Sequence, residues 1–179
     1  MSEHSSALGR AIGEEVILSP YHLGWPHAFS TERARLMSLF SSRLLQIEHF
    51  GSTAIPGMPA KPIIDVLAGV ASMAVADSLF EPILEAGYTT SREFNAMLAD
   101  RRWFMRSLGG KRTHHLHVVV SGSRTWRERL TFRDELRSCA ALAKQYADLK
   151  CELASRFKHD REAYTNAKSE FVAYVLALA

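Results

Sequence analysis

The chain has 179 residues, of which 47% are hydrophobic and 23% are charged. These proportions are those of an ordinary globular protein and argue against a disordered or fibrous chain. The formal net charge of +3 suits an anionic ligand such as a phosphate compound, but it is too small to indicate a nucleic-acid partner, and we expect none.

The length of the chain is that of one compact domain. Residues 1–13 are rich in serine, glycine and charge, so we expect a loose leader there and a single domain over 14–179. No N-terminal stretch joins basic residues to a long apolar run, and no run of 18 apolar residues occurs. We therefore expect a cytoplasmic protein that does not bind membranes. The two cysteines are expected to be free thiols, buried or half-buried in a helix.

The first half of the domain alternates between the apolar patterns that are typical of strands and of helices. In chain order the predicted elements are a β-prone run (14–20), an amphipathic helix (29–44), two strands that can pair (45–52 and 62–70) and a helix (72–87). Ser30 or Thr31 can cap the first helix, and Ser72 can cap the second. Gly87 ends the second helix, and Pro82 favours its division into two short pieces.

The second half predicts one pair of strands and then only helices. The strand pair covers 92–108 and 113–122, although the first of these segments could be partly helical. Helical periodicity covers 126–157 and 160–179, with Asp160 as the cap of the second segment. The layout predicts an α+β fold in which helices pack on one side of a small mixed sheet, with a helical C-terminal region.

Gly51, Ser52 and Asp65 stand where a phosphate site would need them. A Gly-Ser turn at the end of a strand lets backbone N–H groups approach phosphate oxygens, and the serine hydroxyl adds a donor. An aspartate on the adjacent strand can hold the divalent metal that neutralises those phosphates. The alternative is an ordinary turn followed by a strand aspartate, and composition alone favours that alternative.

The segment GSTAIPGMPAKPIID closely resembles the signature of the GrpB family, the UPF0157 group of bacterial proteins with a predicted nucleotidyltransferase fold. It is also similar to the domain fused to dephospho-CoA kinase in some bacteria. Further blocks in family order are ILSPYHLGWPHAF, RRWFMRS, THHLHVVV, FRDELR, YADLK and YTNAKSEF, so the resemblance covers about residues 14–179. It implies a nucleotidyltransferase-like fold with Gly51, Ser52 and Thr53 at the phosphates and Asp65 as the first metal-binding acid.

The sequence departs from the wider superfamily at the second acid. The superfamily pattern continues as Asp, an apolar residue and a second Asp or Glu, whereas this chain has Asp65, Val66 and Leu67. On the later strand, the position that looks acidic in relatives is Val120. Two or three carboxylates usually hold the metals of nucleotidyl transfer, so Asp65 alone would bind Mg²⁺ weakly.

The histidines offer a different set of metal ligands. On an extended strand His115 and His117 point to one face and His114 to the other, so the first two could converge with His49 and Asp65. Neutral imidazoles prefer Zn²⁺, Mn²⁺ or Fe²⁺ to Mg²⁺. Alternatively the histidines form hydrogen bonds across the sheet, or His117 is a general base.

Three lysines could bind phosphate. Lys61 could reach back over the Gly-Ser turn, or it could be a solvated loop residue. Tyr146 with Lys150, and Tyr164 with Lys168, lie four residues apart and share a helix face. A ring beside a cation suits a nucleobase and a phosphate tail, as the resemblance to nucleotidyltransferases implies. The alternative is a packed ring beside a solvated amine.

Several arginines have simpler interpretations. Arg101, Arg102 and Arg112 are candidates for the rim of an anionic pocket. Arg133 and Asp134 predict a charge-assisted anchor between the long helix and the sheet.

The sequence leaves three hypotheses about function. The first is a nucleotidyltransferase that uses a nucleoside triphosphate and a divalent metal (Mg²⁺ or Mn²⁺, or Zn²⁺ if histidines bind it), with Asp65 and His117 as catalytic residues. The second is a nucleotide- or phosphate-binding module that has lost transfer chemistry. The third is an interaction protein linked to coenzyme A biosynthesis. The residues do not predict an oligomeric state.

Overall fold

The structure, a computed structural model, describes residues 15–179, so the leader predicted over 1–13 lies outside the described residues. Its centre is a four-stranded mixed sheet with the strand order β1-β2-β4-β3. The strands are β1 (Gln46–Phe50), β2 (Ile64–Val70), β3 (Arg101–Leu108) and β4 (Lys111–Val120). Strand β2 runs antiparallel to β1 and parallel to β4, and β3 and β4 form an antiparallel pair.

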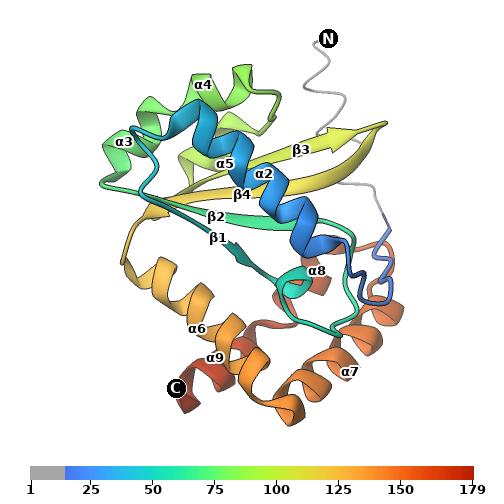
Figure 1. The fold of residues 1–179 in the computed structure, drawn as a ribbon. Coiled ribbons are helices and arrows are strands. Elements are labelled where there is room, and N and C mark those ends of the chain that lie inside the picture. The colour runs from blue at the N-terminus through green and yellow to red at the C-terminus, as the bar shows by residue number, and fades with distance from the viewer. Residues whose placement is uncertain (1–14) are drawn as a thin grey trace.

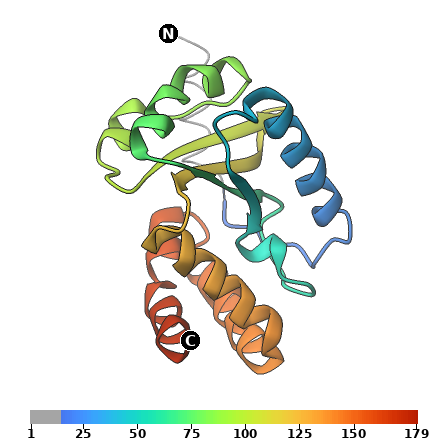
Figure 2. The same ribbon diagram turned by 60° about the vertical axis from the view of Figure 1, so that its left-hand side comes forward.

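Helices lie on both sides of this sheet (Figures 1 and 2). They are α2 (Trp25–Phe40), the 3-10 helix η1 (Ser52–Ala54), α3 (Met73–Ser78), α4 (Phe80–Glu85), α5 (Arg92–Ala96), α6 (Arg124–Ser138), α7 (Ala140–Arg156), α8 (Arg161–Asn166) and α9 (Ser169–Leu178). Helices α2, α3 and α4 lie on one side, and α6 to α9 gather on the other side, where they form the C-terminal region. No helix within residues 15–179 has the length and apolar character needed to span a bilayer.

The alternation of side chains along β2 explains the two layers. Ile64, Val66, Ala68 and Val70 point into the main core, which α2, α3 and α4 cover. Leu67 points to the opposite face and packs in a separate buried cluster that includes Trp126 of α6. The predicted α+β fold with a small mixed sheet and a helical C-terminal region is confirmed. The predicted packing of helices on one side of the sheet holds for α2 to α4. The second face is covered as well, because α6 shields apolar side chains there that would otherwise be exposed to water.

The first helix begins earlier than the sequence pattern predicts. Helix α2 starts at Trp25, and Pro26 occupies its first turn, where the missing N–H costs nothing. The predicted cap Ser30 is therefore inside the helix, where its hydroxyl donates to the carbonyl of Pro26 at 3.0 Å. A proline just before a helical pattern is itself a signal for the start of a helix.

Other boundaries follow the local signals. Ser72 caps α3 and Asp160 caps α8, each accepting a hydrogen bond from a backbone N–H, as predicted. The helix predicted over 72–87 is divided at Leu79, and residues 92–96 are helical before β3 begins. The segment 126–157 is broken at Cys139 into α6 and α7, which the sequence did not predict. Both cysteines are free thiols, but Cys151 is exposed rather than buried or half-buried.

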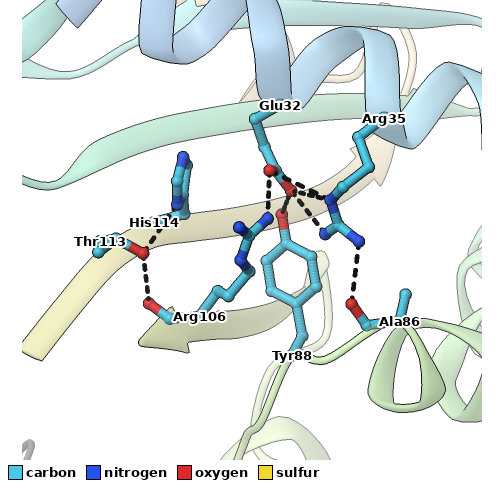
Figure 3. A network of polar contacts seen from close by, with 7 residues as sticks. All are labelled: Glu32, Arg35, Ala86, Tyr88, Arg106, Thr113 and His114. Carbon is cyan, nitrogen blue, oxygen red and sulfur yellow. Dashed lines mark hydrogen bonds and ion pairs between the residues drawn. The ribbon is translucent and has the colours of Figure 1, made fainter. Parts of the chain in front are cut away.

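A buried carboxylate joins α2 to the rest of the first layer. Glu32 is only 3% exposed and accepts hydrogen bonds from Tyr88 Oη at 2.5 Å and Arg35 Nη2 at 2.7 Å. It also pairs with Arg106 of β3, so that helix, strand and the segment after α4 meet at one group (Figure 3). Burial alone would raise the pKa of Glu32, but these hydrogen bonds and the two guanidinium charges outweigh it and hold the pKa below the usual value.

We predict that Glu32→Gln lowers the free energy of unfolding by about 2–3 kcal/mol, because it leaves two half-buried cations, Arg35 and Arg106, without their carboxylate. Urea denaturation at pH 7 measures this. Because the folded-state pKa is lower than the usual 4.5, the stabilisation is present above pH 4.5 and is lost as the pH falls through the folded-state pKa. The control is Glu81→Gln, which breaks an exposed ion pair with Arg92 and should cost less than about 1 kcal/mol. Equal losses for both variants would contradict the prediction.

Candidate functional site

The register of β1 and β2 places Asp65 beside the Gly-Ser turn. Phe50, the last residue of β1, pairs with Asp65, and Gly51 follows with a positive φ of 71°. A Cβ on Gly51 would lie 2.3 Å from Asp65 Oδ2, so only glycine fits here. Ser52 then opens the 3-10 helix η1. The predicted proximity of Gly51, Ser52 and Asp65 is therefore present in the structure, and their role at a phosphate stays a prediction.

The C-terminal helices bring two lysines to this turn. Lys150 of α7 is only 1% exposed, and its ammonium donates to the carbonyl of Pro59 in the loop between β1 and β2. Lys168 lies between α8 and α9, with Nζ 4.1 Å from the centre of the Tyr164 ring. Neither lysine forms an ion pair with a carboxylate among residues 15–179.

Burial makes the positive charge on both lysines costly. Burial, followed by the neighbouring charge of Lys168, lowers the pKa of Lys150 to about 7. Burial also lowers the pKa of Lys168 to about 8. The negative charge of Asp65 acts in the opposite direction on both groups. Neither lysine has a carboxylate partner among residues 15–179, so an incoming anion would stabilise the charged form of both.

The tyrosines have a different role from the one predicted. The Tyr146 ring is 6% exposed and packs against Phe132 and Phe171, with ring centres 5.2 Å and 5.3 Å away, so no face remains for a nucleobase. Burial raises the pKa of its hydroxyl, and the neighbouring Ser52 side chain acts in the opposite direction. Tyr146 thus lies near the Gly-Ser turn as a packed core residue and does not offer its ring to a base.

The remaining lysine of the predicted site joins the same cluster. Lys61 Nζ lies 5.1 Å from the centre of the Tyr164 ring, which also contacts Lys168. An open cleft of about 620 Å³ adjoins Lys168 and Tyr146 between α6 and α9. Its walls include Arg124 and Glu128 of α6 and the small and apolar side chains of α9. Of the phosphate-binding candidates, Lys168 and Tyr146 line this cleft, whose volume would accommodate a nucleoside.

Two predicted residues point away from the site. His49 pairs with Val66, so it faces the main core, where its ring stacks on Phe29 at 4.7 Å. Its Nε2 lies 3.0 Å from the hydroxyl of Thr53, which is 1% exposed and also donates to a backbone carbonyl. His49 therefore lies on the opposite face of the sheet from Asp65, which does not favour its predicted role as a metal ligand. The Thr53 hydroxyl is occupied by contacts with His49 and the carbonyl of Ile63. The cause is the alternation along β1, which turns neighbours of Phe50 to the opposite face.

The other two histidines do face Asp65. His115 pairs with Asp65 in the sheet, and its Nδ1 lies 3.0 Å from Asp65 Oδ1. His117 lies farther along β4, where its buried Nδ1 has no hydrogen-bond partner. Burial, followed by the charges of Arg129, His115 and Arg101, holds the pKa of His117 well below its usual range. His117 is thus neutral and a weak base, which does not favour its predicted role in proton transfer.

The acids needed for a pair of metal ions are missing from the structure as well as from the sequence. Leu67 is fully buried against Phe50, Val119 and Trp126, so the second-acid position is part of an apolar cluster. Val120 pairs with Val70 at the far end of β2, and the β4 residue beside Asp65 is His115. Residues 15–179 contain no group of three or more His, Cys, Asp or Glu side chains placed to hold a metal. The predicted histidine metal site is therefore not formed.

Two arginines of α6 fix the turn in place. Arg133 donates to Glu48 Oε2 at 2.8 Å and to the carbonyl of His49 at 2.9 Å, which confirms the predicted anchor between this helix and the sheet. Arg137 donates to the carbonyl of Ala54 in η1 at 2.9 Å. On the same helix, Arg129 also faces the site and was missed by the sequence analysis. Helical spacing from Trp126 and Arg133 could have placed it there.

A family model described as GrpB protein matches residues 15–177. The chain belongs to the GrpB family. The structure of the conserved protein GrpB from Enterococcus faecalis superposes on this chain with a TM-score of 0.81 and 31% sequence identity. The match covers 90% of this chain and 96% of that one, so the GrpB fold extends over nearly all of both proteins.

Some relatives are much longer proteins than this chain. The UPF0157 protein YqkA of Bacillus subtilis (strain 168) is 39% identical over 158 residues, which make up 88% of this chain and 45% of YqkA. This GrpB chain therefore spans about half the length of that relative. A protein named dephospho-CoA kinase from Mycolicibacterium paratuberculosis is 31% identical over 175 residues, 86% of this chain and 43% of that protein. The predicted resemblance to both groups is confirmed.

We predict that the stability of the ligand-free protein rises with pH above neutrality. Lys150 and Lys168 have folded-state pKa values of about 7 and about 8, below the ordinary 10.5, so between pH 7 and pH 10.5 the unfolded chain binds more protons. The free energy of unfolding should rise by ~2–4 kcal/mol between pH 7 and pH 9.5. Urea denaturation across this range measures it.

The variant Lys150→Met should make this rise in the free energy of unfolding smaller, because only one of the two titrating lysines, Lys168, remains. Lys144→Met on the same helix is the control, since Lys144 is exposed and pairs with Asp148. A wild-type protein whose stability is constant or falls over this range would contradict the prediction.

Proposed function

We propose that this GrpB protein binds a nucleoside triphosphate together with one divalent cation, Mg²⁺ or Mn²⁺. The observation that carries the proposal is a pair of lysines, Lys150 and Lys168, that have no carboxylate partner among residues 15–179. Lys150 lies against the loop that follows the Gly-Ser turn, Lys168 lies against Tyr164, and the charge of Asp65 acts on both. Burying such charges is costly unless a ligand compensates them. A triphosphate tail supplies several negative charges at once.

Each part of the turn has a role in this proposal. The backbone of Gly51 and the hydroxyl of Ser52 approach the phosphate oxygens. Lys150, Lys168 and Lys61 contact the end of the tail. The nucleoside lies in the cleft between α6 and α9, which adjoins Lys168.

The donor set decides how a cation is bound. A pair of ions clamped by several carboxylates does not fit, because Leu67 is part of an apolar cluster. A single Mg²⁺ does fit, since this ion is commonly bound by one or two carboxylates, substrate phosphates and water. Asp65 is the carboxylate that would hold it, and His115 fixes the orientation of Asp65 through Oδ1. When bound, the cation neutralises charge on the phosphates.

A second candidate function is transfer of the nucleotidyl group to an acceptor. The observation that favours it is a group of buried nitrogen atoms without hydrogen-bond partners, on Arg101, His117 and Arg129, which lie on the face of the sheet that Asp65 shares. The buried Leu67, in contrast, favours nucleotide binding without transfer chemistry.

The proposal places the protein in the cytoplasm, where nucleoside triphosphates and magnesium are present. The resemblance to part of a dephospho-CoA kinase supports a connection with coenzyme A biosynthesis.

Isothermal titration calorimetry with ATP, GTP, CTP and UTP, each with and without Mg²⁺ or Mn²⁺, tests nucleotide binding. We expect metal-dependent binding of at least one nucleotide, and Asp65→Asn should abolish the metal dependence. Lys168→Gln should weaken binding about tenfold or more, because it removes a charge-assisted contact. Asp148→Asn, an exposed substitution on α7, is the control and should leave affinity unchanged.

Absence of binding to folded wild-type protein with every nucleotide and metal would contradict the proposal. Release of pyrophosphate from the bound nucleotide, measured in the presence of candidate acceptors, separates transfer from binding alone. Asp65→Asn must stop that release if it arises at this site.

A further inference from the structure

Three side chains that each carry a buried nitrogen atom without a hydrogen-bond partner gather on the second face of the sheet, beneath α6. They are Arg101 of β3, His117 of β4 and Arg129 of α6, which we call the arginine-histidine cluster. Arg101 Nε, His117 Nδ1 and Arg129 Nε are each buried without a hydrogen-bond partner. Buried polar groups are normally satisfied, so three such groups in one place call for a ligand or water.

Contacts with one ring hold the cluster together. The Phe50 ring lies 5.1 Å from the His117 ring in an edge-to-face arrangement, and Arg129 Cζ lies 5.2 Å from the same ring centre. Arg101 pairs with Val119, two residues along β4 from His117 and on the same face. All three side chains are half-buried, so their other atoms extend toward solvent.

The cluster has more positive charge than its surroundings compensate. Arg129 forms no hydrogen bond or ion pair with any residue among 15–179. Arg101 has one carboxylate partner, the exposed Asp100, which it contacts through Nη1 at 3.0 Å. Burial lowers the pKa of Arg129, and the neighbouring charge of Arg101 lowers it further. Two guanidinium groups that repel each other in a partly dry place are stabilised by an anion.

Asp65 relates this cluster to the nucleotide site. Its negative charge acts on Arg129 of the cluster and also on Lys168 of the lysine group. His115, which holds Asp65 in place, lies on β4 two residues before His117 and on the same face. The carboxylate proposed to hold the metal is therefore within electrostatic reach of two separate groups of cations. One group carries the proposed triphosphate, and the other has no ligand assigned.

We propose that the arginine-histidine cluster binds the anionic group, a phosphate or carboxylate, of a second substrate. The nucleophile of that substrate forms a bond to the α-phosphorus of the nucleoside triphosphate while the α–β phosphoanhydride bond breaks and pyrophosphate leaves. This assignment rests on the proposed nucleotide binding and on the second candidate function, nucleotidyl transfer. Guanidinium groups present forks of N–H donors that match phosphate and carboxylate oxygens. Neutral His117 adds one N–H donor in the tautomer with the proton on Nδ1. The acceptor is thus a small anionic molecule whose nucleophile lies near its phosphate or carboxylate.

Inorganic phosphate is the probe for this site. It is titrated by calorimetry into protein saturated with ATP and Mg²⁺, and into nucleotide-free protein, at constant ionic strength. Histidine side-chain ¹H–¹⁵N spectra report at the same time on His117 Nδ1, which should shift as it donates to the anion. We expect phosphate to bind the ATP-loaded protein and to bind Arg129→Gln about tenfold or more weakly.

Two further variants separate charge from geometry. Arg129→Lys keeps the charge but loses the fork and should also weaken phosphate binding. Arg127→Gln removes an exposed arginine from the same helix and should change the affinity by less than about twofold. Thermal melting of each variant checks that it is folded. A lower melting temperature for Arg129→Gln with unchanged phosphate affinity would mean that Arg129 is structural, which overturns the proposal.

Competition between phosphate and ATP would overturn the acceptor assignment, because the cluster would then be part of the nucleotide site. Equal affinity in wild type and Arg129→Gln would overturn the anion site itself. If ATP does not bind at all, the proposed function fails. In that case the nucleotide-free titration still shows whether Arg129 and His117 bind phosphate, so the two failures are distinguishable.

Discussion

The register of β2 between β1 and β4 is the constraint on which the rest of the site depends. It sets Asp65 opposite Phe50 on one side and His115 on the other, so that the carboxylate lies against Gly51 and is held by an imidazole. A slip of one residue would turn Asp65 into the main core and bring Val66 to the site. The apolar residues that alternate with Asp65 prevent this, because they are fully buried under α2 and α3. The same strand register therefore buries the apolar residues of β2 in the core and places Asp65 at the site.

Around that single carboxylate the protein gathers more positive than negative charge. Lys150 and Lys168 approach from the C-terminal helices, and Arg101 and Arg129 approach from β3 and α6. Elsewhere the chain satisfies its buried charges thoroughly, as the network around Glu32 shows. Within residues 15–179, Lys150, Lys168 and Arg129 lack a carboxylate partner, and all three lie where the charge of Asp65 acts on them. A site of this kind costs stability in the ligand-free protein and recovers it when an anion binds.

The sequence predicts the fold better than the site for identifiable reasons. Strands, caps and the Gly-Ser turn follow from local signals, and the place of Asp65 follows from pairing of the two apolar strands. The orientation of His49 and the loss of both ring faces of Tyr146 depend on contacts with Phe29, Phe132 and Phe171, which are distant in the chain. No local pattern reveals such contacts. Arg129 was missed because one arginine among several on a charged helix looks like a solvated side chain until the helix is placed on the sheet.

The central claim is that Lys150 and Lys168 are held for an anion, and proton uptake on nucleotide binding tests it most directly. Binding of ATP with Mg²⁺ should raise both pKa values from about 7 and about 8. Calorimetry in two buffers of different ionisation heat should therefore show uptake of about one proton per nucleotide at pH 8 and close to none at pH 6, where both lysines are already charged. Nucleotide binding without proton uptake at pH 8, or with the same uptake in a Lys150→Met, Lys168→Met double variant, would contradict the account.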